Sequence, residues 1–261
     1  MLPGPASRSR RSADPDSAQP RPDVGELAAR AAEHDGPADR GRALAALAGG
    51  LASSGRAAGV RAVGAGRWLG DVLAEAAPRI RVRDRLTLQV HHPGRTDDEI
   101  AEALVRHASM ATAAFGAAAG ALAAAEFAAP PTLLAAPVQL AAETLAMAAV
   151  EVKLVAELHE LYRQPASGTL RERGSAYLMS WVRQRAVEPA VSGGGIAGVL
   201  GRAAKRELRA RLLRRIGRNL TTLAPFLAGA LAGAEVNRRA TRALGDKVAA
   251  ELRGRLSRRG R

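Results

Sequence analysis

A long apolar segment occupies the middle of the chain. Between Ala108 and Val150 the only charged residues are Glu126 and Glu143, and the eighteen residues Ala108–Ala125 carry no charge at all. Alanine dominates this segment, and it has the highest helix propensity of all residues. The pattern therefore predicts long helices that pack at short separation.

Two prolines and a helix-start pattern divide this segment into a predicted helical hairpin. Pro130 and Pro131 cannot donate to a helical hydrogen-bond ladder, so a helix ends before them. Thr96 and Glu99 have the spacing of a capping box, in which each side chain accepts from the backbone amide of the other residue. The two predicted arms are Thr96–Ala128 and Thr132–Tyr162.

Shorter helical patterns lie on both sides of the hairpin. Breaks are predicted at Asp35–Pro37, at Gly49–Gly50 and at Gly193–Gly195, where glycine and proline cluster. The expected helices are Asp23–His34, Arg40–Leu51, Arg56–Ala76, Leu170–Val187, a basic helix that ends near Ile216, and a last helix that opens at Asn219 and frays over Arg253–Arg261. Ile80–Val90 alternates apolar and polar residues, which predicts a short strand or an extended connector.

These elements predict an all-α fold: an alanine-rich helical bundle built on the long hairpin, preceded by a disordered N-terminal tail. The tail is rich in proline, serine and charged residues, which favours a solvated chain. The expected layout is a tail at 1–22, an N-terminal helical region at 23–90 with the possible strand or connector, a helical core domain at 91–252, and a basic tail at 253–261.

The acidic residues of the hairpin are expected to face water. Glu126 and Glu143 lie near the proline tip, where an exposed position avoids burying a charge. The alternatives are a hydrogen bond within the bundle and a carboxyl that titrates. The acids of the second arm are interpreted as a solvated helix face with local ion pairs. This predicted face consists of Glu151, Lys153, Glu157 and Glu160.

No pattern in the chain predicts catalysis, a metal or a cofactor. Cysteine is absent, which removes thiolate nucleophiles and cysteine-based metal sites. The glycines of Gly193–Gly198 have dinucleotide-motif spacing, but no strand precedes them and no ribose-binding acid follows. His91 and His92 lie near the acids Asp97–Glu99, and a solvated loop is the favoured interpretation of that group. An enzyme is therefore the least favoured class.

The net charge of +14 is concentrated in the last quarter of the chain. Residues 202–261 contain seventeen Lys and Arg against four acids. The arginines expected to contact a membrane or another anion are Arg202, Arg206, Arg209, Arg214 and Arg215. Such a basic helix can lie on an anionic bilayer or bind the phosphates of a nucleic acid. A solvated basic surface without a partner is the third alternative.

Two aromatic residues favour lipid over nucleic acid. Tyr177 and Trp181 are four residues apart, so they share a helix face, and such residues are enriched where a membrane meets water. The uncharged run Ala108–Ala125 would span about 27 Å as a helix. Alanine and glycine gain little from lipid, however, so a shallow contact or a buried hairpin is favoured over a stable span. The glycine pairs Gly116/Gly120 and Gly229/Gly233 fit close helix contact in either setting.

Two segments of the chain resemble a known family. They are PPTLLAAPVQLAAETLAMAAVEVKLVAELHELY at 130–162 and LTTLAPFLAGALAGAEVNRRATRALGDKVAAEL at 220–252, and they look like the EcsC family and a related helical domain attached to some bacterial GTPases. Pro225, Gly229 and Asn237 match the second element, whereas Arg163 follows Tyr162 where the family has glycine. The resemblance implies a helical, membrane-proximal protein and no catalytic residues.

The sequence thus predicts a non-enzymatic, membrane-associated helical protein that acts as a binding or scaffold component. The first residues lack the apolar stretch of a secretory signal, so the expected location is the cytoplasmic, inner face of the cell membrane, held peripherally or by shallow insertion. An anionic membrane surface is the expected partner. The alternatives are a nucleic-acid-associated protein and a soluble helical interaction domain.

Overall fold

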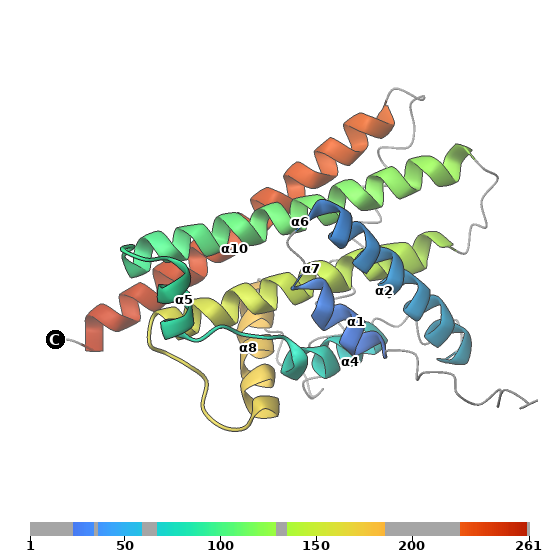
Figure 1. The fold of residues 1–261 in the computed structure, drawn as a ribbon. Helices are drawn as coiled ribbons and strands as arrows, with labels where there is room; N and C mark the ends of the chain where they lie inside the picture. The colour runs from blue at the N-terminus through green and yellow to red at the C-terminus, as the bar shows by residue number, and fades with distance from the viewer. Residues whose placement is uncertain (1–22, 34–35, 59–66, 129–134, 186–224, 260–261) are drawn as a thin grey trace, which may run out of the picture.

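The computed structural model describes residues 23–33, 36–58, 67–128, 135–185 and 225–259, and in these residues all regular structure is helical (Figure 1). The predicted all-α class is confirmed. The helices are α1 (Val24–Ala31), α2 (Pro37–Ala58), α4 (Arg67–Ala76), the 3₁₀ helix η1 (Ala77–Arg79), α5 (Arg85–His91), α6 (Asp97–Ala128), α7 (Ala135–Leu161), α8 (Leu170–Arg185) and α10 (Pro225–Arg259).

The two arms of the predicted hairpin are α6 and α7. The capping box at the start of α6 is formed as expected: the Glu99 amide donates to Thr96 Oγ1 over 3.3 Å, and the Thr96 amide donates to Glu99 Oε2 over 2.8 Å. The observed arms agree with the predicted ones to within three residues at each end. The proline tip lies outside the described residues.

α7 is the central helix of the bundle. Every residue from Gln139 to Val152 is buried, and α7 contacts α1, α2, α4, α5, α6, α8 and α10. Figure 1 shows α7 between the long α6 and α10 on one side and the shorter N-terminal helices on the other. A helix that is buried on all sides needs apolar residues around its whole circumference, which is the pattern of this segment.

α6 and α10 form the longest helix pair. They run antiparallel, since Asp98 near the start of α6 bonds Arg253 near the end of α10, and Thr112 meets Thr241 farther along. Gly116 allows the close approach: a Cβ atom there would lie 3.2 Å from the Gly233 carbonyl oxygen and 2.5 Å from Asn237 Nδ2. The predicted close contact at these glycines is thus observed for Gly116 and Gly233.

The N-terminal region and the hairpin share one hydrophobic core. Leu44 and Leu47 of α2 and Leu69 of α4 are buried in the same cluster as Leu145 and Leu158 of α7. Burial of such leucines contributes about 1.5–3 kcal/mol each. The segments 23–90 and 91–252 are therefore joined by packing along the whole central helix.

Of the two alternatives for Ile80–Val90, the strand is wrong, and the extended connector is confirmed for the first part of the segment. This part is extended without a partner strand, and the rest is α5. The Asp84 carboxylate accepts from the Thr87 amide over 2.7 Å and so starts the helix. The alternation of apolar and polar residues does not distinguish a pleated strand from an arginine-rich connector. Here Arg83 of the connector bonds Glu157, and Arg85 at the start of α5 bonds Asp97.

Two other boundary predictions are wrong. α2 continues through Gly49–Gly50, where a break was expected, because Gly50 packs against α1: a Cβ there would lie 2.8 Å from Leu27 Cδ1. The C-terminal residues expected to fray are helical up to Arg259, and Arg253 pairs with Asp98. The break at Asp35–Pro37 is confirmed, since α1 ends at Ala31 and α2 starts at Pro37. The predicted tail at 1–22 lies outside the described residues.

Candidate functional site

Three glutamates of α7 are buried inside the bundle, which overturns the predicted solvated face. Glu151, Glu157 and Glu160 are 2%, 2% and 8% exposed. A buried carboxylate needs donors to replace water, and each of these has an arginine and at least one further donor. These donors come from α8, α10 and the connector before α5.

Glu151 has the most complete set of partners. Its Oε2 accepts from Trp181 Nε1 over 2.9 Å and from Arg185 Nε over 3.0 Å. Its Oε1 accepts from Thr241 Oγ1 over 2.7 Å and from the second guanidinium nitrogen of Arg185. A carboxylate offers about four acceptor positions. All four are used, so Glu151 joins α7, α8 and α10 and has no acceptor left for a substrate.

A pair of threonine hydroxyls extends this network to α6. Thr112 Oγ1 lies 2.9 Å from Thr241 Oγ1, and both side chains are fully buried. Because the Thr241 hydroxyl donates to Glu151, Thr241 accepts from Thr112, whose hydroxyl also lies 3.1 Å from the Ser109 carbonyl oxygen. Four helices, α6, α7, α8 and α10, are thus connected through one carboxylate.

Glu157 holds the connector before α5. Arg83 donates to it through Nε over 2.7 Å and through Nη2 over 2.8 Å, a bidentate arrangement. Lys153 Nζ lies 3.9 Å from the same carboxylate and donates to the Arg81 carbonyl over 2.9 Å. These bonds keep the extended segment 81–84 against α7 and so place α5.

Glu160 ties the end of α7 to α8. It accepts from Tyr177 Oη over 2.6 Å and from Arg173 over 2.5 Å. Tyr177 Oη also accepts from the Ala166 amide over 3.1 Å. Burial, and then the bond to Glu160, raise the pKa of Tyr177. The bonds from the tyrosine to Glu160 and Ala166 order the loop between the two helices.

The two aromatic residues predicted at a membrane interface are part of this interior. Tyr177 is 3% exposed and Trp181 is 8% exposed. In this conformation neither side chain can contact a membrane, so that part of the predicted site is corrected. The physical reason is the demand of Glu160 and Glu151 for donors, which the phenol and the indole supply.

Glu143 is also buried, contrary to the expected exposure. Asn237 Nδ2 donates to its Oε1 over 3.3 Å across the α7–α10 contact. The side chain of Glu126 lies outside the described residues. The interior of the bundle therefore contains four glutamates of α7 in all among the described side chains.

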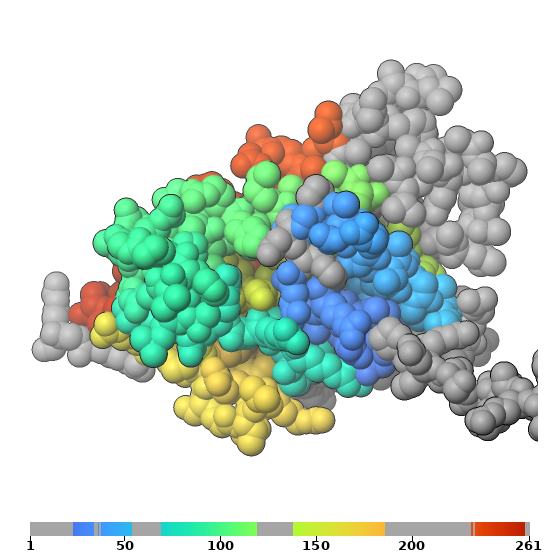
Figure 2. Space-filling view, in the orientation of Figure 1, coloured from blue at the N-terminus to red at the C-terminus, as the bar shows by residue number. Residues whose placement is uncertain are grey.

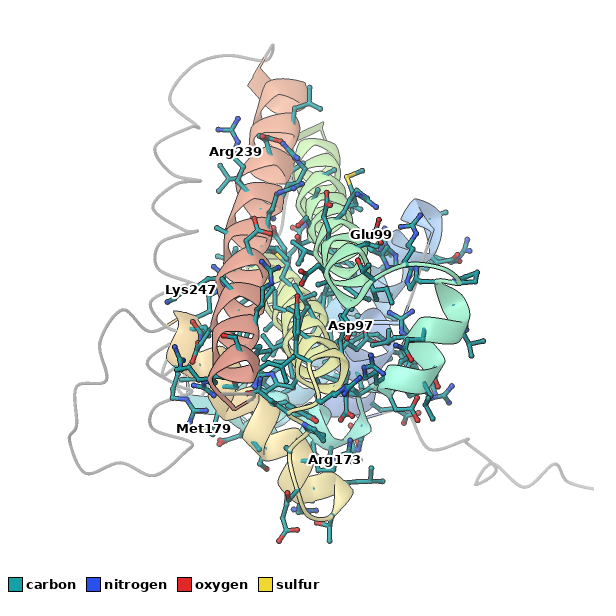
Figure 3. The ribbon with its side chains drawn as sticks, turned by 90° about the vertical axis from the view of Figure 1, so that its left-hand side faces the viewer. Asp97, Glu99, Arg173, Met179, Arg239 and Lys247 are labelled. Carbon is teal, nitrogen blue, oxygen red and sulfur yellow. The ribbon has the colours of Figure 1, made fainter. Side chains whose placement is uncertain are left out.

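The predicted membrane-contacting arginines, Arg202, Arg206, Arg209, Arg214 and Arg215, lie outside the described residues, as does the glycine motif at 193–198. The basic surface that the structure does describe belongs to α10. Figure 3 shows Arg239 and Lys247 projecting outward from this helix, away from α6 and α7. α10 carries eight cations against three acids in all.

The remaining candidates are the two histidines at the end of α5. Of the histidines in the predicted solvated loop, His91 is exposed and His92 is half-buried, with a pKa that burial lowers. Across the described ranges, no three His, Asp or Glu side chains are grouped so that they could hold a metal ion. Within the same part of the chain, no helix has the length and apolar character needed to cross a membrane.

No protein-family model, curated protein or solved structure matches the chain. The buried carboxylates are occupied by donors from neighbouring helices, whereas the cations of α10 face outward. The described surface of α10 therefore carries an excess of positive charge.

Proposed function

We propose that this protein is a peripheral membrane component that binds the anionic inner face of the cell membrane and acts as a helical scaffold there. The observation that carries the proposal is the exposed basic surface of α10. Arg239, Arg242, Lys247, Arg255 and Arg258 are all exposed on this helix. A cation near an anionic bilayer contributes on the order of 1 kcal/mol, so several acting together can hold a protein at the surface.

The acids of α10 leave this surface positive. Glu235 is paired with both Arg238 and Arg239, whose hydrogen bonds lower the pKa of its carboxyl to about 2. Glu251 is paired with Arg255, and Asp246 lies 3.8 Å from Arg242. Each acid is matched by at least one cation, and the excess of cations remains for an external anion.

Exposed apolar residues on α10 favour lipid over nucleic acid. Val236 and Leu256 are exposed on this helix, three residues before Arg239 and three residues after Arg253. Contact with nucleic-acid phosphates does not remove aliphatic side chains from water, whereas an amphipathic helix on a bilayer buries them below the headgroups. The resemblance of 130–162 and 220–252 to the EcsC family points in the same direction. We propose no catalytic role for any residue.

Co-sedimentation with lipid vesicles tests this function. We expect the full chain to bind vesicles that contain phosphatidylserine, to bind phosphatidylcholine vesicles weakly, and to be released by salt because screening weakens exposed charges. The variant Arg255→Glu/Arg258→Glu should bind at least tenfold more weakly, since four units of charge change at the end of α10. The matched control is Arg42→Glu/Arg171→Glu, which alters two exposed arginines of α2 and α8.

Three results would overturn the proposal. One is the absence of binding to phosphatidylserine vesicles at low salt. Another is equal loss of binding in the control variant, which would show that only net charge matters. The third is tight, salt-sensitive binding of duplex DNA by a chain that ignores vesicles, which would favour the nucleic-acid alternative.

A further inference from the structure

Two large apolar side chains of α5 point away from the bundle. Leu86 is 72% exposed and Val90 is 77% exposed, whereas Leu88 between them is fully buried. Residues four apart in a helix lie side by side, so Leu86 and Val90 form one small apolar patch on the outer face of α5. Figures 1 and 3 show α5 standing at the outer edge of the bundle.

This patch is rigidly presented. Arg83 is bound to the buried Glu157 just before α5, and Arg85 at the start of α5 donates to Asp97 over 2.9 Å and 3.0 Å and to the Leu161 carbonyl over 3.2 Å. A loop held in this way cannot fold its apolar residues inward without breaking bonds to partly buried charges. The exposure of the pair is therefore a property of the folded state.

Cations lie at the same end of the bundle. Arg95 is exposed in the turn after α5, and Arg163 is exposed directly after α7. The C-terminal end of α10, with Arg255 and Arg258, also lies at this end, as Figure 1 shows. Arg253 pairs with Asp98 in the first turn of α6, which fixes that end of α10 beside the α5–α6 connection.

The acids at this end are engaged within the protein. Asp84 caps α5, Glu99 caps α6, Asp97 and Asp98 accept from Arg85 and Arg253, and Glu251 pairs with Arg255. In Figure 2 the blue-green segment that contains α5 covers the left-hand part of the visible face, and part of the red C-terminal helix α10 shows at its edge. The surface therefore combines a projecting aliphatic pair with outward-facing arginines.

We infer that this end of the molecule is the surface that contacts lipid, with Leu86 and Val90 entering the acyl region of an anionic bilayer while Arg95, Arg255 and Arg258 contact the phosphates. This inference rests on the proposed function and adds the orientation of the bundle: the end that contains α5 faces the membrane. Arginines can reach headgroups while aliphatic neighbours sit deeper.

Lipid suits this patch better than a protein partner. Two aliphatic side chains offer roughly 150–250 Å² of apolar area, whereas a stable protein partner covers about 800 Å² on each side. A second copy of the chain would also place its own arginines against Arg95, Arg255 and Arg258. A bilayer needs no complementary shape, takes each side chain separately, and supplies the negative charge.

A single labelled cysteine tests the contact directly, because the natural chain contains no cysteine. Val90→Cys is labelled with an environment-sensitive nitrobenzoxadiazole group and mixed with phosphatidylserine-containing vesicles. The matched control is Leu170→Cys on α8, whose native side chain is 74% exposed. We expect a blue shift and quenching by spin-labelled acyl chains at position 90, and neither effect at position 170.

A second variant measures the contribution of the pair to binding. Leu86→Gln/Val90→Gln should lower the vesicle partition coefficient at least tenfold, because two aliphatic side chains no longer gain from leaving water. Leu170→Gln/Met110→Gln is the control, as these side chains are 74% and 55% exposed on α8 and α6. Circular dichroism should show unchanged helicity for both, since no buried atom is altered.

The outcomes separate this inference from the proposed function. If the chain binds vesicles but the probe at position 90 stays in water, the inference is overturned and peripheral binding stands. If neither the natural chain nor the labelled variants bind vesicles, the inference and the proposed function both fail. A blue shift at position 90 that depends on protein concentration, without vesicles, would mean that a second copy covers the patch, and it would also overturn the inference.

Discussion

Trp181 of α8 donates its indole N–H to Glu151 of α7, across 30 residues of sequence. This bond places an aromatic ring beside the centre of the bundle and supplies a donor to a carboxylate that is almost wholly buried. The same carboxylate receives the guanidinium of Arg185 and the hydroxyl of Thr241. The packing of α8 and α10 on α7 thus depends on one acid.

Removal of one donor to Glu151 should destabilise the fold by a moderate amount. Thr241→Val keeps the shape of the side chain but leaves Oε1 of Glu151 one hydrogen bond short and removes one of the two acceptors of the Thr112 hydroxyl, the other being the Ser109 carbonyl. We expect a loss of about 1–3 kcal/mol in the free energy of unfolding. Urea denaturation monitored by circular dichroism measures it.

The control for this prediction is an exposed hydroxyl. Ser167→Ala alters an exposed serine in the loop between α7 and α8, and its effect should be under about 0.5 kcal/mol. Equal effects of the two substitutions would show that the buried network adds nothing.

Loss of the carboxylate itself should cost more than loss of a hydroxyl. Glu151→Ala leaves Arg185, Trp181 and Thr241 without their shared acceptor, and breaking a buried ion pair from one side costs about 3–5 kcal/mol. Glu151→Gln should fall between the two substitutions, because an amide keeps the volume and one acceptor oxygen. The denaturant midpoints of the three variants give the order of their stabilities. A Glu151→Ala variant as stable as the natural chain would contradict the prediction.

Two glycines should respond in opposite ways to replacement by alanine. Gly41 in α2 has open space where a Cβ would be, so Gly41→Ala should stabilise the protein by about 0.5–1 kcal/mol through helix propensity. At Gly116 a Cβ would meet Asn237 Nδ2 at 2.5 Å, so Gly116→Ala should destabilise by about 1–3 kcal/mol as α6 and α10 separate. Thermal unfolding of both variants tests the contrast, and a stabilised Gly116→Ala would be evidence against the close contact.

Alkaline pH should destabilise the fold through its tyrosines. The chain has two, Tyr162 and Tyr177, and burial is the first cause that raises the pKa of each above the ordinary 10.0. The unfolded state therefore loses these protons at lower pH, so stability is complete below pH 10.0 and falls as the pH rises through the folded-state values. Ultraviolet titration of the phenolates, native against denatured, measures the shift.

The variant Tyr177→Phe should isolate the contribution of one tyrosine. Its stability should decline less steeply above pH 10.0 than that of the natural chain, although it starts lower because Glu160 has lost a donor. Identical slopes for the two chains would show that Tyr177 ionises equally easily in both states.

Mild acid should weaken the end of α7 through His159. Burial lowers the pKa of this imidazole from the ordinary 6.5, while its Nδ1 lies 2.7 Å from the Val155 carbonyl. The unfolded state takes up the proton first, so the contribution to stability is present above pH 6.5 and is lost as the pH falls through the folded-state value. His159→Gln should reduce the difference in melting temperature between neutral and mildly acidic solution, whereas the exposed His91→Gln should leave it unchanged.

The helices were largely predictable because their signals are local. The capping box at Thr96 and Glu99 and the prolines at 130 and 131 act within a few residues of the helix ends that they determine. The alternating pattern at Ile80–Val90 left a strand and a connector open, because the bond that decides between them joins Arg83 to Glu157, 74 residues along the chain. The signal for the buried acids was present in their surroundings: Glu151, Glu157 and Glu160 lie in a helix with apolar residues on all sides, where a solvated face has little room.

The sequence by itself determined the all-α class, the hairpin α6–α7 and the excess of positive charge near the C-terminus, since propensity, capping and composition need no tertiary contact. Only the tertiary structure decided which charges are buried and which apolar residues stay exposed. The donors of Glu151 and Glu157 lie 30 and 74 residues away in the chain, so no local pattern pairs them. Leu86 and Leu88 likewise differ only in the side of α5 that faces α7, and that orientation depends on where Arg83 and Arg85 find their carboxylates.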